Sequence, residues 1–163
     1  MSQGGDFASY LACRTGSVTA LASVGVLNYQ ADCPSQTPIP VVAFVGRSDP
    51  IYLIDEGLNE AAPFSGPPAA RPGPLVDEAD AWAEANGCKS DPTVIEDSGG
   101  VDRVEYDCPT GREVIYYLHD GGHTWPGSRP APGLEVFLGP GFPDLPANEI
   151  IWEFFAGAAG ASG

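Results

Sequence analysis

The sequence predicts one α/β domain whose mainly parallel sheet is flanked by helices. The length of 163 residues suits a single domain with a sizeable buried core. Helical and strand patterns alternate along the chain, as they do in parallel α/β folds. The strand segments are short, continuous apolar runs, which is the pattern of strands buried on both faces of a sheet.

The first part of the chain is expected to form a helix and two buried strands. Apolar residues recur at helical spacing in residues 6–14, namely Phe7, Tyr10, Leu11 and Cys13. Gly16 follows them and is expected to end the helix. Residues 18–26 and 41–45 are apolar and rich in valine, which predicts two central strands.

Residues 57–74 are rich in Pro, Gly and Ala and show no period, so we expect a surface loop rather than a domain linker. A helix is expected next, over residues 76–86. Asp77 and Glu78 favour its first turn, and Gly87 is expected to end it.

The last part of the chain is expected to contain a hairpin, a strand and a helix. A Ser-Gly-Gly turn at residues 98–100 separates two β-branched runs, as in a hairpin. The expected elements are, in order, strands at 94–96, 101–106 and 113–118, a helix at 147–156 and a flexible tail at 157–163.

The chain is strongly acidic, with a formal charge of −15 and only 7 Lys and Arg residues. A surface of this sign repels phosphate groups, so we expect neither nucleic acid nor a membrane as a partner. No run approaches the roughly 20 apolar residues that span a bilayer. The 21 Gly and 17 Pro indicate many turns and ordered loops.

The four cysteines form two pairs in the sequence, and the two members of each pair are 20 positions apart (33 − 13 and 108 − 88). Zinc ligands more often come as close doublets, so two local disulfides are favoured over a zinc site or free thiols. Disulfides imply an oxidising compartment, yet no signal-peptide pattern follows Met1. A secreted chain that has lost its N-terminal part, or a start assigned to an internal Met, would reconcile these observations.

Residues 1–5, Met-Ser-Gln-Gly-Gly, match the second part of a Gly-x-Ser-x-Gly nucleophile elbow. In this motif the serine lies on a tight strand-to-helix turn, and Gly4 and Gly5 are expected to supply the space for it. The helix N-terminus would favour an oxyanion at Ser2, with the backbone N–H of Gln3 as a donor. The alternative is that Ser2 is an ordinary terminal residue.

A Gly-Gly-His-Thr-Trp-Pro-Gly run follows the strand expected at residues 113–118. Gly121 and Gly122 allow a tight turn, from which His123 could reach a serine on another loop and act as a general base. Trp125, followed by Pro126, would stiffen the far side of the loop. The alternative is an exposed histidine in a turn.

A metal site is a second alternative, because His119 and Asp120 lie close to His123 in the sequence. The intervening glycines break any helix that would align the two histidines. No third ligand is evident, so we expect neither a metal nor another cofactor.

Asp49 follows the strand expected at residues 41–45, where a carboxylate can orient the catalytic histidine. Its rival is Asp55, which lies farther into the loop. Gly46 and Pro50 place Asp49 beside the strand end and favour it over Asp55. A purely structural role as a turn former is the alternative.

With these residues the chain resembles the secreted serine esterase family that includes polyhydroxybutyrate depolymerases, feruloyl esterases and acetylxylan esterases. The Gly-Gly-His-Thr-Trp-Pro-Gly run is the most specific part of the match. The matching segments cover nearly the whole chain in order: residues 1–5 with 11–13, 46–50, 86–88, 121–127 and 151–155.

The resemblance implies the C-terminal portion of an α/β-hydrolase fold over residues 1–163, with the N-terminal strands missing. It also implies Ser2 as nucleophile, Asp49 orienting His123, secretion, and an ester substrate. The disulfides that it implies are Cys13–Cys33 and Cys88–Cys108. One departure is Val45, because the family has a histidine before the corresponding glycine.

The larger departure is the absence of the strands that precede the elbow and supply a second oxyanion donor. Loss of one such donor typically lowers turnover by about 10² to 10³. The isolated chain is therefore expected to be weakly active or inactive. An N-terminal partner or self-association could complete the sheet.

Three functions remain open at this stage. The chain is part of a serine esterase, or it is an esterase only after assembly with a partner or with itself. The third possibility is a disulfide-stapled module that binds a carbohydrate or polymer through Trp125 without catalysis.

Overall fold

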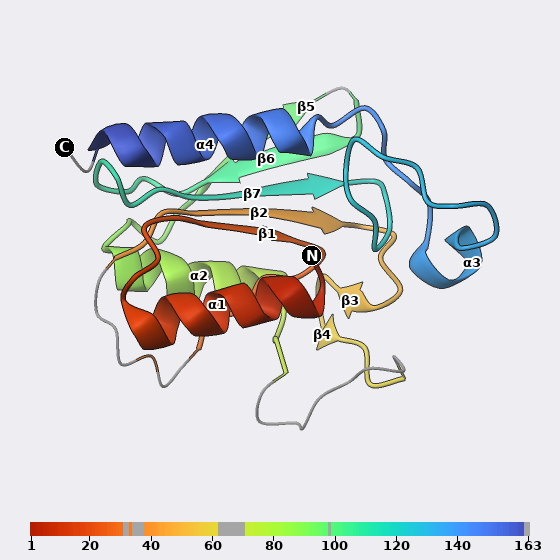
Figure 1. The fold of residues 1–163 in the computed structure, drawn as a ribbon, viewed down its shortest axis with the longest axis horizontal. Helices are drawn as coiled ribbons and strands as arrows, with labels where there is room; N and C mark the ends of the chain where they lie inside the picture. The colour runs from red at the N-terminus through yellow and green to blue at the C-terminus, as the bar shows by residue number, and fades with distance from the viewer. Residues whose placement is uncertain (31–32, 34–37, 62–70, 98, 162–163) are drawn as a thin grey trace.

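The structure, a computed structural model, describes residues 1–30, 33, 38–61, 71–97 and 99–161. Figure 1 shows the arrangement of its elements. In chain order they are α1 (Gln3–Thr15), β1 (Leu21–Val24), β2 (Val41–Gly46), β3 (Tyr52–Leu53), β4 (Gly57–Leu58), α2 (Leu75–Asn86), β5 (Thr93–Asp97), β6 (Val101–Glu105), β7 (Val114–His119), α3 (Glu135–Leu138) and α4 (Ala147–Ala161).

Five strands form one mixed sheet in the order β1-β2-β7-β6-β5. The strands β1, β2 and β7 run parallel, with Leu21 opposite Val41 and Val41 opposite Val114. β6 pairs antiparallel with both β7 and β5. β3 and β4 form a separate antiparallel pair.

The prediction of a mainly parallel sheet of the α/β-hydrolase type is wrong. The sheet is small and mixed, with two antiparallel pairings beside two parallel ones, and it is accompanied by four helices. The physical reason is that the expected hairpin, β5 and β6, pairs along the free side of β7. Apolar runs identify buried strands, but they do not specify which edge a hairpin joins.

The helices enclose the sheet from both faces. Figure 1 shows α1 and α2 on one face and α4 on the other, while α3 lies on a loop beyond the strand ends. Side chains of β2 alternate between the two faces, as the period of a strand requires. Val41, Ala43 and Val45 join the core under α1 and α2, and Val42 and Phe44 join the core under α4.

The expected hairpin, the expected strand before His123 and the three expected long helices are confirmed. Gly16 and Gly87 end α1 and α2 in the left-handed conformation, as predicted. α4 continues to Ala161, into the segment expected to be a tail, because its last residues include several alanines. None of the described helices has the length and apolarity needed to cross a membrane.

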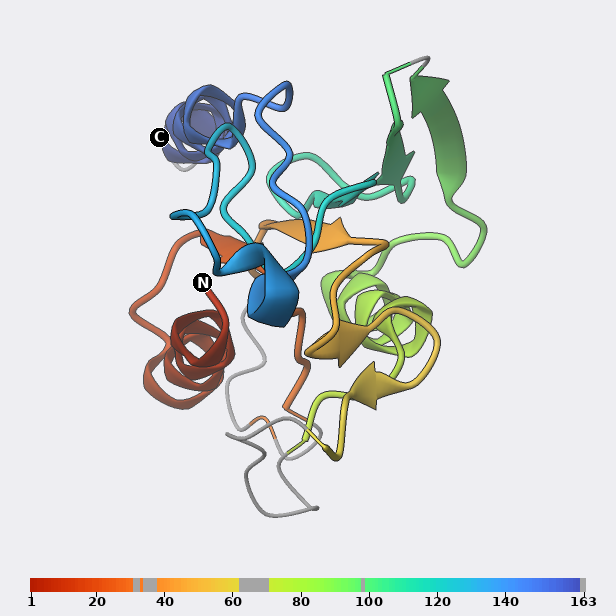
Figure 2. The same cartoon turned by 90° about the vertical axis from the view of Figure 1, so that its right-hand side faces the viewer.

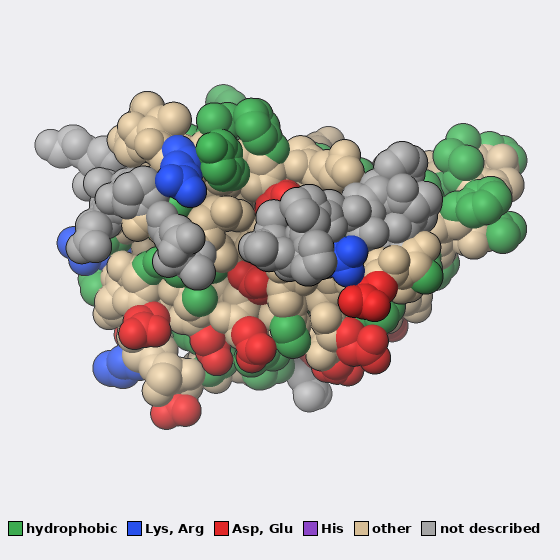
Figure 3. Space-filling view, turned by 90° about the horizontal axis from the view of Figure 1, so that it is seen from below, with side chains coloured by type: hydrophobic (Ala, Val, Ile, Leu, Met, Phe, Trp, Pro, Cys, Tyr) green, Lys and Arg blue, Asp and Glu red, His purple; other side chains and the backbone are tan. Residues whose placement is uncertain are grey.

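The elements β3, β4 and α3 were not expected from the sequence. β4 lies inside the loop expected at residues 57–74, and residues 62–70 of that loop lie outside the described part of the chain. Figure 3 shows one face of the molecule, with several acidic side chains and few basic ones. This distribution agrees with the overall charge of −15.

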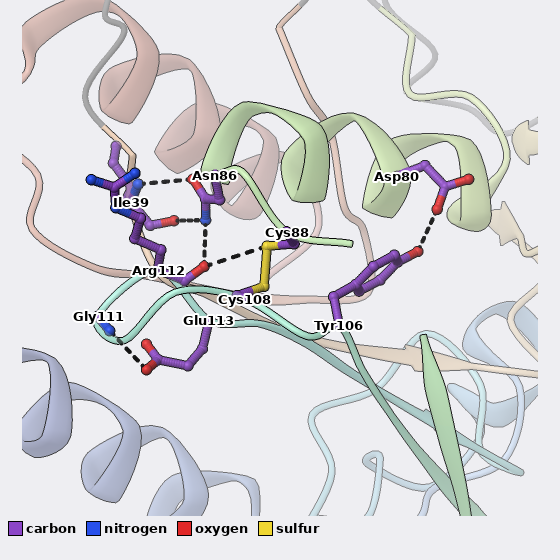
Figure 4. Close-up of a disulfide and its surroundings, with 9 residues drawn as sticks. All are labelled: Ile39, Asp80, Asn86, Cys88, Tyr106, Cys108, Gly111, Arg112 and Glu113. Atoms are coloured by element: carbon purple, nitrogen blue, oxygen red, sulfur yellow. Dashed lines mark hydrogen bonds between the residues drawn. A yellow bond between two sulfur atoms is a disulfide. The ribbon is translucent and has the colours of Figure 1, made fainter. Parts of the chain in front are cut away.

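Both disulfides are present: Cys13–Cys33 and Cys88–Cys108. They fit an oxidising, extracellular environment. Figure 4 shows that the second disulfide joins the end of α2 to the segment that leads into β7.

Asn86 secures the same end of α2 beside the disulfide (Figure 4). Its side-chain amide donates to the carbonyls of Ile39 at 2.8 Å and Arg112 at 2.9 Å, and its oxygen accepts the Ile39 N–H at 3.1 Å. Ile39 and Arg112 precede β2 and β7, so these bonds fix α2 against the start of both strands.

Candidate active site

The candidate catalytic residues gather at the C-terminal ends of the three parallel strands. Ser2 precedes α1, Asp49 follows β2 and His123 follows β7. Figure 2, seen from this end, shows the N-terminus and α3 near the ends of the strands. Parallel strands end at a common edge, so the topology brings together segments that are far apart in sequence.

Asp49 and His123 form a buried hydrogen-bonded pair. The distance from His123 Nδ1 to Asp49 Oδ2 is 2.6 Å, and each residue is 4% exposed. Because a carboxylate only accepts hydrogen bonds, this contact places the imidazole proton on Nδ1. Nε2 is then free to accept a proton, as a general base requires. It is buried and has no hydrogen-bond partner among the described residues.

The second carboxylate oxygen fixes the orientation of Asp49. Oδ1 accepts the backbone N–H groups of Ile51 at 2.7 Å and Tyr52 at 2.9 Å. The carboxylate therefore forms an Asx turn and also contacts the imidazole, so the turn-forming role does not exclude the contact with His123. The rival Asp55 is exposed in a turn.

The loop that carries His123 is held by the last residue of α3 and by the segment that follows it. The backbone N–H of His123 donates to Leu138 O at 2.5 Å, and the N–H of Gly122 donates to Pro140 O at 2.7 Å. A Cβ on Gly122 would lie 2.1 Å from Leu138 O, so only glycine allows this approach. Nothing in the sequence pattern indicated the contact with Leu138.

Gly25 supports the imidazole from the end of β1. Its φ is +76°, and a Cβ there would lie 3.0 Å from His123 Cε1. The adjacent residue, Val24, accepts the backbone N–H of Ser2 at 2.8 Å. Ser2 and His123 are thus anchored to neighbouring residues of one strand end. A glycine directly after a valine-rich run was the signal that could have identified Gly25.

Ser2 has an unusual backbone conformation, with φ 54° and ψ −132°. It is the only residue other than glycine with a positive φ in the described part of the chain. Such strain is often found at functional sites. Ser2 occupies the N-cap position of α1, yet its hydroxyl makes no capping hydrogen bond to the helix.

The residues expected to support the elbow differ in their packing. A Cβ on Gly5 would lie 2.3 Å from Ser23 Oγ, so Gly5 does supply space for close packing. Gly4 meets nothing within 4 Å, so the expectation that it also supplies such space is wrong. Gln3 is the first residue of α1. Amide groups in this turn point toward the helix N-terminus.

Trp125 ties the histidine loop to α4. Its indole N–H donates to Asn148 Oδ1 at 2.9 Å. Asn148 lies in the first turn of α4, so the expected stiffening role of Trp125 is supported by a specific contact.

His119 has a structural environment that differs from that of His123. It is buried, its Nδ1 accepts the N–H of Gly121 at 3.1 Å, and its ring stacks on Phe142. Burial, and then the nearby charge of Arg47, lower the pKa of His119 to about 4. No group of three or more His, Cys, Asp or Glu side chains that could hold a metal ion occurs among the described residues.

Comparison of the chain with protein-family models gives no match, and comparison with the curated proteins gives none either. The arrangement at the strand ends must therefore be interpreted from its own chemistry.

Proposed function

We propose that this chain carries the Ser2, Asp49 and His123 triad of a carboxylic ester hydrolase, and that the isolated chain hydrolyses esters only weakly. The observation that carries the proposal is the buried Asp49–His123 hydrogen bond of 2.6 Å, which leaves His123 Nε2 as the basic nitrogen. A buried pair of this kind, with the second carboxylate oxygen fixed by the backbone, is typical of a histidine held for proton transfer. The strained, non-capping conformation of Ser2 adds support.

The mechanism follows from these groups. Ser2 Oγ attacks the ester carbonyl carbon while His123 Nε2 accepts the hydroxyl proton, and Asp49 stabilises the resulting imidazolium. The backbone N–H of Gln3 stabilises the oxyanion. The tetrahedral intermediate expels the alcohol oxygen, which takes the proton from His123. Water then attacks the acyl-enzyme, with His123 again as base, and releases the acid and Ser2.

The proposed substrates follow from the resemblance described above. Polyhydroxyalkanoate, feruloyl and acetyl esters are the three classes that it suggests. The mechanism needs no cofactor. We also propose that the protein acts outside the cell or in the periplasm, because its two disulfides persist under oxidising conditions.

The alternative is a non-catalytic module that binds a carbohydrate or polymer through Trp125. This function gives no role to the buried Asp49–His123 pair. It also has to accommodate the hydrogen bond that already holds the indole of Trp125 on Asn148.

A Ser2→Ala variant tests the proposal. We expect the weak hydrolysis of p-nitrophenyl acetate and butyrate to fall to the uncatalysed rate, because the nucleophile is lost. A fluorophosphonate probe should label the unmodified chain at Ser2 and leave the variant unlabelled. Ser17→Ala is the matched control, since Ser17 is exposed beyond the other end of α1.

Equal hydrolysis by the chain and by Ser2→Ala would refute the proposed nucleophile. Binding of an insoluble polymer by both proteins, with no hydrolysis by either, would favour the binding module instead.

A further inference from the structure

Arg47 connects the turn that holds Asp49 with the loop that holds His123. It directly follows β2, and its backbone N–H donates to the carbonyl of His119 at 2.7 Å. Its guanidinium Nη1 lies 2.9 Å from Oδ1 of Asp120, which precedes His123 by three positions. One side chain therefore spans the two segments whose alignment sets the Asp49–His123 contact.

The other contacts of the guanidinium extend to β6. Nη2 of Arg47 lies 2.5 Å from Asp102 Oδ2, and Nη1 donates to Gly100 O at 3.3 Å. The backbone N–H of Asp120 donates to the same Gly100 carbonyl at 3.1 Å. Arg47 thus joins the end of β2, the beginning of β6 and the end of β7 in one network.

The two loops approach each other without intervening side chains. The N–H of Ser48 donates to Gly121 O at 3.0 Å, and a Cβ on Gly46 would lie 2.2 Å from the same oxygen. Residues 121–124 of the His123 loop are buried, and both backbone hydrogen bonds and the Arg47 side chain join this loop to the Asp49 turn. A planar guanidinium that bonds two carboxylates fixes direction as well as distance, which a single ammonium group does not.

We propose that Arg47 is a positioning residue that holds the Asp49 turn and the His123 loop in the alignment that brings Asp49 Oδ2 to His123 Nδ1. In this proposal Arg47 acts through its contacts with Asp120, Asp102 and Gly100 and not through a contact with the His123 imidazole. The kinetic consequence rests on the proposed ester hydrolysis, whereas the structural consequence is measurable without it.

The kinetic test compares Arg47→Met with Arg103→Met. Arg103 lies on the same sheet, its side chain is 31% exposed against 28% for Arg47, and it pairs with Glu105. We expect Arg47→Met to lower kcat about 10- to 100-fold with little change in KM, because a shift of about 1 Å in catalytic geometry has an effect of this size. Arg103→Met should leave kcat unchanged, and Arg47→Lys should recover only part of the loss.

The structural test is the proton NMR resonance of His123 Nδ1–H, which the short bond to Asp49 shifts downfield. Asp49→Asn identifies this resonance by removing the charged acceptor. In Arg47→Met we expect the resonance to move upfield and exchange faster with water. It should be unchanged in Arg103→Met.

The outcomes separate the two proposals. If the unmodified chain hydrolyses no ester and the fluorophosphonate probe leaves Ser2 unlabelled while the resonance responds to Arg47→Met, the positioning role stands and the proposed function fails. If Arg47→Met keeps both kcat and the resonance of the unmodified chain, the positioning role is refuted.

A variant that retains the arginine guards against misfolding of Arg47→Met. Asp120→Asn removes one partner of Arg47 and should lower kcat by a smaller factor, with a smaller upfield shift of the resonance. If Arg47→Met has the same melting temperature as Arg103→Met, its loss of kcat does not come from unfolding. If Asp120→Asn folds and changes neither kcat nor the resonance, the bridge from Arg47 to the His123 loop has no positioning effect.

Discussion

The two carboxylate oxygens of Asp49 form hydrogen bonds with different partners. Oδ1 accepts two backbone N–H groups of the following turn, and Oδ2 faces the imidazole. The turn therefore holds the carboxylate even when the charge on His123 changes. Asp49 therefore stabilises the local turn and also sets the tautomer of His123.

Asp49→Asn should preserve the turn and abolish most of the activity. The asparagine oxygen can still accept from the turn, but its amide would donate to Nδ1 and favour the wrong histidine tautomer. We expect kcat to fall by about 10³ to 10⁴ with nearly unchanged stability. Ester hydrolysis and thermal unfolding measure the two effects. Asp55→Asn is the control, and equal loss in both variants would contradict the assignment.

His119 should remain neutral well below the usual pKa of histidine. Its folded-state pKa of about 4 lies below the value of about 6.5 expected in the unfolded chain. The unfolded state thus binds more protons between these values, so His119 contributes stability fully above about pH 6.5 and loses it as the pH falls toward 4. Titration of the ring nitrogens by NMR measures this pKa. A midpoint near 6.5 would contradict the effect of burial.

The sequence predicts the polar residues of the site better than its packing. Ser2, Asp49 and His123 occur in short motifs whose chemistry depends on residue type, and the structure joins two of them directly. Gly25 and Leu138 act through backbone atoms and close approach. Such contacts depend on the tertiary fold: residue type gives a signal at Gly25 and none at Leu138.

At the scale of elements, α3 links an apolar surface to the histidine loop. Val136 is 82% exposed and Phe137 is 70% exposed, while the carbonyl of Leu138 accepts the N–H of His123. Figure 3 shows hydrophobic side chains at the end of the molecule where Figure 1 places α3. An apolar acyl chain held by Ser2 would find an apolar surface close to the site.

Replacing Val136 and Phe137 together by serine should weaken hydrolysis of long-chain esters more than that of acetate esters. Each buried CH₂ contributes about 0.8 kcal/mol, so only the longer chains lose substantial contact. The ratio of kcat/KM for p-nitrophenyl octanoate and acetate measures this change. Trp152→Ser is the control, because Trp152 is equally exposed but lies on α4. An unchanged ratio would exclude α3 from substrate binding.

Elements were easier to predict than their pairing. Helix periods and glycine stops predicted α1 and α2, and the turn at residues 98–100 predicted the hairpin. The side of β7 on which this hairpin pairs depends on long-range register, which local patterns do not contain. α3 has only four residues, which are too few to show a helical period of apolar residues. Its apolar side chains Val136 and Phe137 are exposed, so no buried face identifies it either.

At the scale of the whole molecule, β1 is an edge strand that pairs with β2 alone among the described strands, and on its open side Val24 O accepts the N–H of Ser2. Beside it, α1 exposes Phe7, Tyr10 and Leu11. An open edge next to apolar surface favours pairing with another strand. Self-association, one of the two ways expected to complete the sheet, can be tested at this edge.

Ala22→Pro should weaken this association. Leu21 and Gly25 donate toward β2, so by alternation the N–H of Ala22 points away from it. Proline at this position removes a donor from the open edge without removing a bond to β2. Sedimentation velocity over a range of concentrations should show a dimer for the unmodified chain and a monomer for the variant. A monomer at all concentrations in the unmodified chain would contradict self-association at this edge.

The pairing of β2 with β7 also determines when the site can form during folding. Val41 and Val114 are 73 positions apart (114 − 41), so this contact requires closure of a long stretch of chain. The β5, β6 and β7 strands are joined by local connections and can form earlier. On the ribosome, Asp49 is synthesised long before His123, and the two residues can meet only after most of the chain has emerged. The Asp49–His123 pair therefore forms late in synthesis.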